Sequence, residues 1–194
     1  MKLPVPEKIP VSEICRGMGL PSHAEPDEAT LALAEKAAAM VMESAQPQAV
    51  HGLVFALEGD LLYGQSFLTV RLPSGRKLFY PKPFLKENQF GRPAVHYYTV
   101  GQQTRKWEVA STYGGKMVEN IVQAIARDCL AETLKRIDAR GLQVVFHVHD
   151  EVIIDAPMET TVEEICGLMA EPIPWAPGLI LRGAGFESSY YMKD

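Results

Sequence analysis

The sequence reads YGGKMVENIVQAIARDCLAETLKRIDARGLQVVFHVHDEVIIDAP from residue 113 to residue 157, a helical pattern followed directly by two β-prone runs. Over residues 116–141 the apolar residues recur at the spacing of one helix face. The inner side of this helix is expected to carry Val118, Ile121, Val122, Ile125, Cys129, Leu130, Leu134 and Ile137. We expect Gly114 and Gly115 to break the chain before the helix, and Gly141 stands where a helix stop belongs.

The two β-prone runs, residues 142–148 and 151–156, flank His149 and Asp150 at the expected turn. The two tip residues of a tight hairpin cannot both bury their side chains, and Asp tolerates turn conformations. Asp150 should therefore be held rigidly while it faces solvent or a ligand. Glu151 lies beside it, and two adjacent carboxylates suit a hard cation such as magnesium (Mg2+). An ordinary turn aspartate followed by a strand glutamate is the alternative interpretation.

A third interpretation starts from the H-x-H pair His147 and His149. Two histidines on one strand face are a known arrangement for zinc or another transition metal. Such a site needs a further His, Cys or carboxylate, and the other histidines (His23, His51 and His96) have no ligand-like spacing. A zinc-dependent hydrolase built on this pair would contain stoichiometric zinc.

Polar residues on the long helix form a second pattern. Lys116, Asn120, Gln123 and Arg127 are spaced four, three and four residues apart, so they should line one helix face. All four can donate hydrogen bonds, and such a row could lie along a duplex minor groove, where the acceptors depend little on base sequence. A stripe that simply faces solvent is the alternative.

The rest of the chain is interpreted as an irregular arm at residues 1–27 and a single domain at residues 28–194. The other expected elements are a helix from Asp27 to about Ala45, strand–turn–strand patterns at 52–64 and 67–81 with EGD and PSGR as turns, a strand at 93–101, a short helix through Met169 capped by Thr161 and Glu164, and a strand and ordered loop in the tail at 175–194. This order predicts an α+β fold in which antiparallel β-hairpins pack with the long helix.

The net charge of -5 hides a cationic block between Arg71 and Lys116. That block holds nine basic residues and two acids, a net charge of +7, so the rest of the chain carries -12. Aromatic residues are interleaved with these charges. Bases could stack on some of them while basic side chains, Arg105 and Lys106 among them, meet phosphates. A solvated basic surface over an aromatic core is the alternative.

The three cysteines (Cys15, Cys129 and Cys166) are few and widely spaced. This usage is typical of reduced cytosolic side chains rather than a disulfide framework or a zinc cluster. No run approaches the ~20 apolar residues of a membrane span, and the first ten residues lack the apolar run of a signal peptide. We therefore expect a cytoplasmic protein with no membrane partner.

Taken together, residues 113–157 resemble the C-terminal palm of family A DNA polymerases, the bacterial polymerase I group, and most of all its phage and prophage branch. VHDE at 148–151 resembles the motif C of that family, and the helix before it resembles the palm helix that contacts the primer–template minor groove. VRLPSGRKLFYPKP at 70–83, FGRPAVHYYTVGQQTRKW at 90–107 and GFESSYY at 185–191 also look like that branch. The resemblance covers about residues 28–194 and implies a bacterial or phage-infected host.

The resemblance implies roles for the hairpin residues. Asp150 matches the catalytic aspartate that holds the divalent metals, and Glu151 matches its acidic neighbour. His149 matches the histidine beside the primer end. The implied cofactor is Mg2+, and the implied partners are a DNA primer–template and a deoxynucleoside triphosphate.

The same resemblance bears on the long helix. Gln123 matches the minor-groove glutamine of the family. The family has an asparagine four residues before that glutamine, where this chain has Glu119, so the neighbouring Asn120 is taken to make that contact. Lys116 and Arg127 are also expected to contact DNA. This expectation comes from their position on the same helix face and not from the resemblance.

The chain departs from the family in one important respect. Family A polymerases need a first catalytic aspartate in a D-Y-S-x-x-E-like motif and a fingers helix for the incoming nucleotide, and neither pattern occurs here. The nearest candidate, Asp60 in EGDLLYG, falls at an expected hairpin turn. Two-metal phosphoryl transfer needs a clamp that holds both ions, for which one Asp with a neighbouring Glu is a poor fit. The hypothesis is therefore a palm fragment or subunit, inactive without a complementary polypeptide; the alternative is a catalytically inactive DNA-binding remnant.

Overall fold

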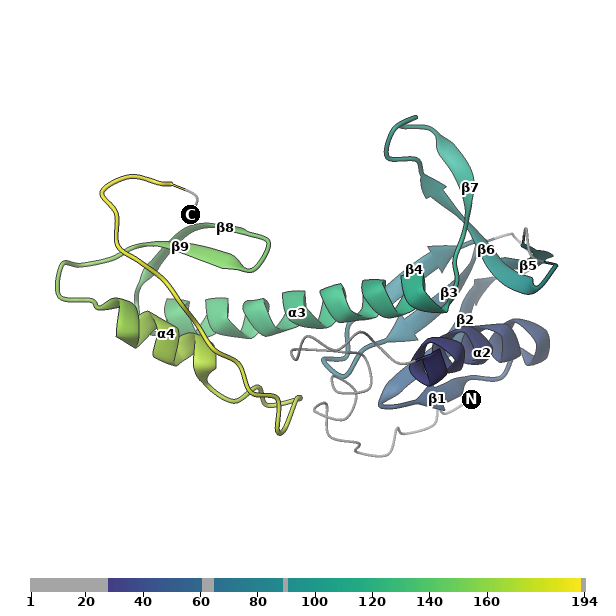
Figure 1. Ribbon diagram of the computed structural model, residues 1–194, viewed down its shortest axis with the longest axis horizontal. Helices are drawn as coiled ribbons and strands as arrows, with labels where there is room; N and C mark the ends of the chain where they lie inside the picture. Colours follow the sequence, from purple (N-terminus) through teal and green to yellow (C-terminus); the bar gives the residue numbers. More distant parts are fainter. Residues whose placement is uncertain (1–27, 61–64, 89–90, 193–194) are drawn as a thin grey trace. The chain divides into compact units, whose positions relative to one another are not determined.

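The computed structural model describes residues 28–60, 65–88 and 91–192 (Figure 1). In chain order the elements are α2 (Glu28–Ser44), β1 (Gln48–Val50), β2 (Leu53–Asp60), β3 (Gln65–Arg71), β4 (Lys77–Pro81), β5 (Phe84–Glu87), β6 (Pro93–Val100), β7 (Trp107–Ser111), α3 (Gly114–Ala139), β8 (Gln143–Val148), β9 (Glu151–Asp155) and α4 (Val162–Ala170). The chain divides into two compact units, Met1–Val122 and Gln123–Asp194. The predicted arm at 1–27 lies outside the described residues.

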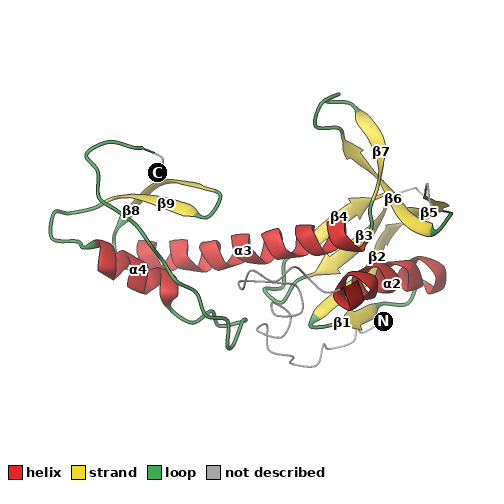
Figure 2. Ribbon diagram, viewed as in Figure 1, coloured by secondary structure: helices red, strands yellow, loops and turns green. Residues whose placement is uncertain are grey.

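The first unit is built on an antiparallel sheet with the strand order β1-β2-β3-β4. Helix α2 contacts β1 and β2 (Figure 2). Consecutive residues of β2 and β3, among them Phe55 and its partner Val70, are buried, as are Ala38 and Val41 of α2, so both faces of these strands are covered there. Small side chains on the helix allow the two layers to approach closely. Burial of each large apolar side chain contributes about 1.5–3 kcal/mol, so this core is the main source of stability in the unit.

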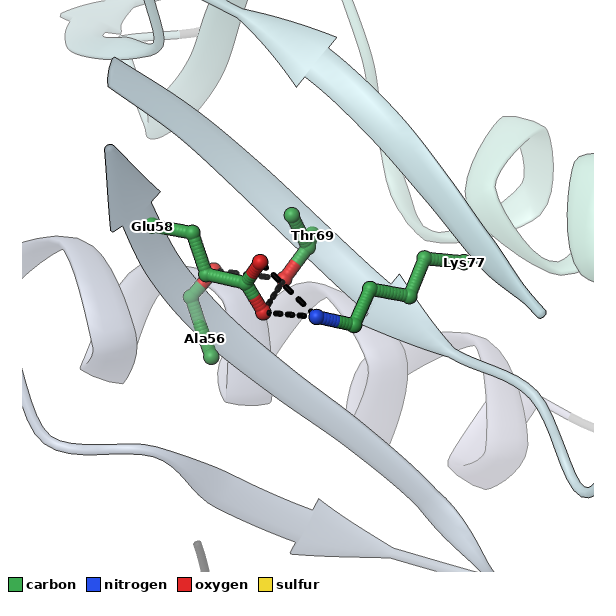
Figure 3. Close-up of polar contacts among 4 residues, drawn as sticks. All are labelled: Ala56, Glu58, Thr69 and Lys77. Atoms are coloured by element: carbon green, nitrogen blue, oxygen red, sulfur yellow. Dashed lines mark hydrogen bonds and ion pairs between the residues drawn. The ribbon is translucent and has the colours of Figure 1, made fainter. Parts of the chain in front are cut away.

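Side chains also link the three strands β2, β3 and β4. The Lys77 ammonium on β4 lies 2.7 and 2.8 Å from the two carboxylate oxygens of Glu58 on β2 (Figure 3). Thr69 Oγ1 on β3 lies 3.1 Å from Glu58 Oε1 and 3.3 Å from the carbonyl oxygen of Ala56. The half-buried carboxylate is thus held by one cation and one hydroxyl.

A second sheet of the first unit has the order β5-β6-β7 and is also antiparallel. One side of β6 packs inward: Val95 is buried, and the ring of Tyr97 meets that of Tyr80 on β4 edge to face at 4.9 Å. Strand β4 contacts β6, which joins the two sheets of this unit.

Gly114 and Gly115 were expected to break the chain before the long helix. This prediction is wrong, because they are the first two residues of α3. A Cβ at Gly114 would overlap the carbonyl oxygen of Leu31 on α2. Glycine is therefore needed there for the close approach of two backbones. The prediction of the helix itself is confirmed, and six of its eight predicted inner residues are buried, with Val122 and Leu134 half-buried.

The second unit consists of the C-terminal part of α3, the β8–β9 hairpin, α4 and the tail. Gly141 follows the end of α3 with a φ of 74°, which confirms the predicted helix stop. The predicted cap of α4 is also confirmed, since Thr161 Oγ1 accepts a hydrogen bond of 3.2 Å from the backbone N–H of Glu164.

Arg136 of α3 fastens the other end of α4. Its guanidinium donates to the carbonyl oxygens of Leu168 at 3.2 Å, Glu171 at 2.9 Å and Pro172 at 2.6 Å. The last carbonyls of a helix have no partner within the helix, so a cation there satisfies them and complements the helix dipole. Only 16% of the Arg136 side chain is exposed.

Two turn and strand predictions are wrong. Glu58, Gly59 and Asp60 are not a turn but the end of β2, paired with Phe67, Ser66 and Gln65. Gly59 has a φ of 98°, and a Cβ there would overlap the carbonyl oxygen of Gln65, so this glycine serves a strand rather than a turn. The expected strand in the tail is also absent from its described residues, 175–192, since no neighbouring strand pairs with it there. The PSGR turn between β3 and β4 is confirmed.

The α+β class is confirmed, with antiparallel sheets and three helices in the described residues, while the resemblance to a polymerase palm stays a prediction. The short strands β1, β5 and β7 were not predicted. No helix among the described residues is long and apolar enough to cross a membrane. Cys129 and Cys166 are both free thiols, and Cys15 lies outside the described residues.

Candidate functional site

The β8–β9 hairpin carries the acidic residues singled out in the sequence. Its last pair, Val148 with Glu151, leaves His149 and Asp150 as a two-residue tip. Both tip side chains are exposed, whereas Glu151 is half-buried. His149 takes the left-handed conformation with a φ of 51°, which a hairpin this tight requires of at least one tip residue. The predicted exposure of Asp150 at the tip of the hairpin is therefore confirmed.

The oxygen donors at this tip fit one class of metal better than another. Magnesium binds one or two protein carboxylates and completes its octahedron with phosphate and water oxygens, so Asp150 and Glu151 supply a suitable partial set. A structural zinc site needs three or four protein ligands. Among the described residues, no group of three or more His, Cys, Asp or Glu side chains is placed to hold a metal ion. A magnesium site at Asp150 and Glu151 therefore stays a prediction.

The H-x-H pair does not form the strand-face arrangement on which the zinc hypothesis rests. His147 lies in β8, but the strand ends at Val148, and His149 belongs to the turn. His147 Nε2 also lies 3.2 Å from an Nη atom of Arg127. A guanidinium can only donate, so this ring nitrogen is the acceptor and its lone pair is engaged by a fixed positive charge. Both observations argue against zinc at His147.

The Arg127–His147 contact also shows how the hairpin is held. Arg127 comes from α3 and His147 from β8, both in the second unit. On the preceding residue of β8, the ring of Phe146 meets that of Tyr191 edge to face at 5.0 Å. The strand that leads to Asp150 is thus fastened on a helix and on the tail, which reduces the freedom of the tip.

The predicted row on α3 is present, and Lys116, Asn120 and Arg127 also contact other side chains of the protein. The Lys116 ammonium lies 2.9 Å from a carboxylate oxygen of Glu119, and this hydrogen bond and charge raise the pKa of Lys116. The Asn120 amide donates to the Tyr80 hydroxyl at 3.2 Å within the first unit. Gln123 is exposed on α3. The contacts of these residues with DNA stay predictions. Asn120 also links α3 to β4 through its hydrogen bond to Tyr80.

Arg105 and Lys106 lie in the connection between β6 and β7 and are both exposed. Two backbone hydrogen bonds of 2.9 Å close this turn, from the Gly101 N–H to the Lys106 carbonyl and from the Arg105 N–H to the Gly101 carbonyl. Arg105 takes a φ of 53° there. The turn therefore presents two adjacent cations at the end of the sheet.

Two residues that organise these surfaces, Arg136 and Tyr80, were not among the predicted site residues. Arg136 carried no signal, because its partners lie 32 to 36 positions away in the sequence. Tyr80 was noted only as one of many aromatic residues, although it is 4% exposed and bonds Asn120. The hydroxyl of a buried tyrosine usually has a hydrogen-bond partner, so a tyrosine in a β-prone run was the signal that could have identified Tyr80.

Comparison with known proteins gives one informative match. A DNA polymerase of Bacillus phage SP02 is 48% identical to this chain over 147 residues, which is 74% of the chain and 22% of the phage protein. The chain therefore spans about a fifth of the length of the curated relative that it matches. No protein-family model matches the chain. No solved structure matches it significantly.

Proposed function

We propose that this chain forms the palm portion of a family A DNA polymerase active site and contributes Asp150 as a metal-binding carboxylate. Two observations support the proposal together. The chain is 48% identical over 147 residues to a phage protein named DNA polymerase. Its β8–β9 hairpin exposes Asp150 at a two-residue tip, directly before Glu151. The exposed tip is the observation on which the proposal depends.

The reaction is attack of a primer 3′-hydroxyl on the α-phosphate of a deoxynucleoside triphosphate, with release of pyrophosphate. Magnesium, when bound, neutralises charge on the phosphates and activates the attacking oxygen. Asp150 and Glu151 hold it from the protein side. His149, on the same tip, is placed next to the primer end, and Gln123 and Asn120 donate hydrogen bonds to minor-groove acceptors. Lys116, Arg127, Arg105 and Lys106 neutralise backbone phosphates.

Two carboxylates on one hairpin do not make a complete two-metal clamp. We propose that a complementary polypeptide supplies the first catalytic aspartate and the fingers. This chain alone then binds primer–template without extending it. A catalytically inactive DNA-binding remnant would behave in the same way alone, and the two differ only when the missing parts are restored.

The test restores those parts in one polypeptide. In a chimera of the phage SP02 polymerase, the 147-residue stretch of this chain that matches the phage protein replaces its counterpart there, and primer extension is measured in Mg2+. Asp150→Asn should lower extension by at least about 10²-fold, because a charge that neutralises the reacting phosphates is lost. Asp155→Asn is the matched control, since Asp155 is an exposed aspartate at the end of β9 in the same hairpin. It should change little.

A chimera that does not extend primers contradicts the catalytic proposal and favours the inactive remnant. Equal extension by the Asp150→Asn and Asp155→Asn chimeras contradicts the role of Asp150. The complementary-polypeptide proposal has its own test: the isolated chain is mixed with a polypeptide that holds the other parts of the phage enzyme. Extension by the mixture, but by neither component alone, is the expected result.

A further inference from the structure

We propose that one face of the β5–β6–β7 sheet binds unpaired nucleotides by stacking, and that it is a site separate from the hairpin tip. This aromatic face is defined by Phe84, His96, Tyr98 and Trp107. The strand register places them together, because Phe84 pairs with His96, and Trp107 pairs with Val100 two residues beyond Tyr98. The inference rests on the proposed function only in taking DNA as the nucleic acid.

The four rings form a continuous run across the sheet. His96 and Phe84 stack at 5.4 Å between ring centroids with an interplanar angle of 23°. Phe84 and Tyr98 are tilted at 6.4 Å, and Tyr98 and Trp107 stack at 6.3 Å, again at 23°. Stacked neighbours turn π-faces toward one another, so the outer π-face of Trp107, at the exposed end of the run, is the one left for an incoming base.

The outer end of this face is exposed, whereas Ala94 at the start of β6 is buried on it. Trp107 is 56% exposed, and Val100 and Val109 on the same face are also exposed. The opposite face packs through buried Val95 and through Tyr97 against Tyr80. A contiguous apolar surface that the fold leaves open is a mark of a binding site.

Charge decides which kind of partner fits. Residues 82–111 hold five basic residues and two acids, a net charge of +3. The register puts both acids, Glu87 and Glu108, on the opposite face, since they pair with Pro93 and Thr99. Within the three strands, the aromatic face therefore carries no acid.

Basic groups border the same face. The Lys82 ammonium lies 5.8 Å from the Tyr98 ring centroid, and Lys86 shares the face through its pairing with Ala94. Arg105 and Lys106 directly precede Trp107 in the turn. Flat rings flanked by cations match a single strand, which offers both bases and phosphates, whereas duplex DNA offers no open base faces for stacking.

The experiment measures binding of the full chain to a labelled oligothymidylate of about 12 nucleotides, a length within the range of single-strand sites. Fluorescence anisotropy gives the affinity, and a duplex of equal length is the comparison. Trp107→Ala should weaken single-strand binding about 10- to 100-fold, with a much smaller effect on the duplex. Trp107→Phe keeps a ring and should retain most of the affinity.

Phe79→Ala is the matched control, because Phe79 is an aromatic of similar exposure, 55%, on the other sheet of the same unit. It should leave oligothymidylate binding unchanged. The fluorescence of Trp107 in a Trp175→Phe background should be quenched by the oligonucleotide, which reports stacking directly. Arg105→Ala should lower the salt slope of single-strand binding by about 0.7.

Oligothymidylate affinity that is equal in the parent chain, Trp107→Ala and Phe79→Ala would overturn the proposal. So would oligomerisation of the parent chain that Trp107→Ala abolishes, because a second protein copy would then cover the face. The outcome is separable from the polymerase proposal. If extension by the chimera depends on Asp150 but oligothymidylate binding does not depend on Trp107, only the stacking site is rejected. If binding depends on Trp107 but extension does not depend on Asp150, only the polymerase proposal is rejected.

Discussion

Replacing Arg136 by Met tests whether one cation holds α4 on the long helix. The guanidinium makes three hydrogen bonds to the carbonyls of Leu168, Glu171 and Pro172, and its Nε lies 3.4 Å from the Glu171 carboxylate. Met keeps most of the aliphatic stem and removes all of these contacts. We expect the free energy of unfolding of the second unit to fall.

The expected loss follows from the exposure of each bond. The bond to Leu168 is half-buried, and a charge-assisted bond of this kind contributes about 1.5–3 kcal/mol. The bonds to Glu171 and Pro172 are exposed, so water can replace much of them and about 0.5 kcal/mol each is reasonable. The sum is about 2.5–4 kcal/mol, which is a large part of the stability of a domain.

Urea unfolding is followed by Trp175 fluorescence in a Trp107→Phe background, because these are the two tryptophans and Trp175 lies in the second unit. With a typical slope of about 2 kcal/mol/M, Arg136→Met should lower the midpoint by about 1–2 M. Lys135→Met is the matched control. Lys135 is the preceding residue and forms a 2.7 Å ion pair with Glu132, but its side chain is 69% exposed. It should cost less than about 0.5 kcal/mol.

Equal midpoints for the Arg136→Met and Lys135→Met variants would refute the reasoning. The three carbonyls would then be satisfied by water at no loss, and α4 would be held on α3 by its apolar contacts alone. Arg136→Lys refines the test: a single ammonium cannot reach three carbonyls as a planar guanidinium does, so an intermediate midpoint is expected.

Three further predictions concern stability. Thr161→Ala should cost about 1 kcal/mol in urea unfolding and Thr161→Ser only a few tenths, because Ser keeps the capping oxygen; equal losses would contradict the cap. Burial raises the pKa of Tyr80, against a smaller lowering by the Asn120 hydrogen bond. Since its folded pKa exceeds the unfolded value of 10.0, the stability it contributes is complete below pH 10 and is lost as pH rises beyond it. Tyr80→Phe should therefore flatten the alkaline decline in urea midpoint, and an unchanged slope would count against this assignment. A double-mutant cycle with Lys77→Met and Glu58→Gln should give a coupling of about 0.5–1.5 kcal/mol that shrinks in 1 M salt, as the pair is about one-third exposed; a coupling of zero at low salt would show that the pair does not contribute.

Local patterns were enough to predict α3, the hairpin and the cap of α4. The signals for these elements lie within three or four residues of one another: the apolar spacing of α3, the two residues between β8 and β9, and Thr161 with the N–H of Glu164. The exposure of Asp150 could be predicted for the same reason, since a two-residue tip leaves its side chain nowhere to be buried.

Long-range contacts account for the failed predictions. Gly114 begins a helix because the backbone of Leu31 approaches it, and no pattern around residue 114 reveals that neighbour. The apolar tail has strand character, but without a neighbouring edge to pair with it stays a loop. Glu58 and Gly59 resemble turn residues, yet pairing with Phe67 and Ser66 keeps them in β2.

The aromatic residues of β6 show most clearly what the sequence determines and what only the tertiary structure determines. His96, Tyr97 and Tyr98 are adjacent in the sequence, so composition could assign aromatic character to the strand but not to either face. Pairing with β5 and β7 places His96 and Tyr98 with Phe84 and Trp107, while Tyr97 turns to Tyr80. Side-chain type and local spacing depend on neighbours along the chain and can be read directly. The face a side chain occupies, and its partner there, depend on strand register and packing between distant segments, which exist only in the folded protein.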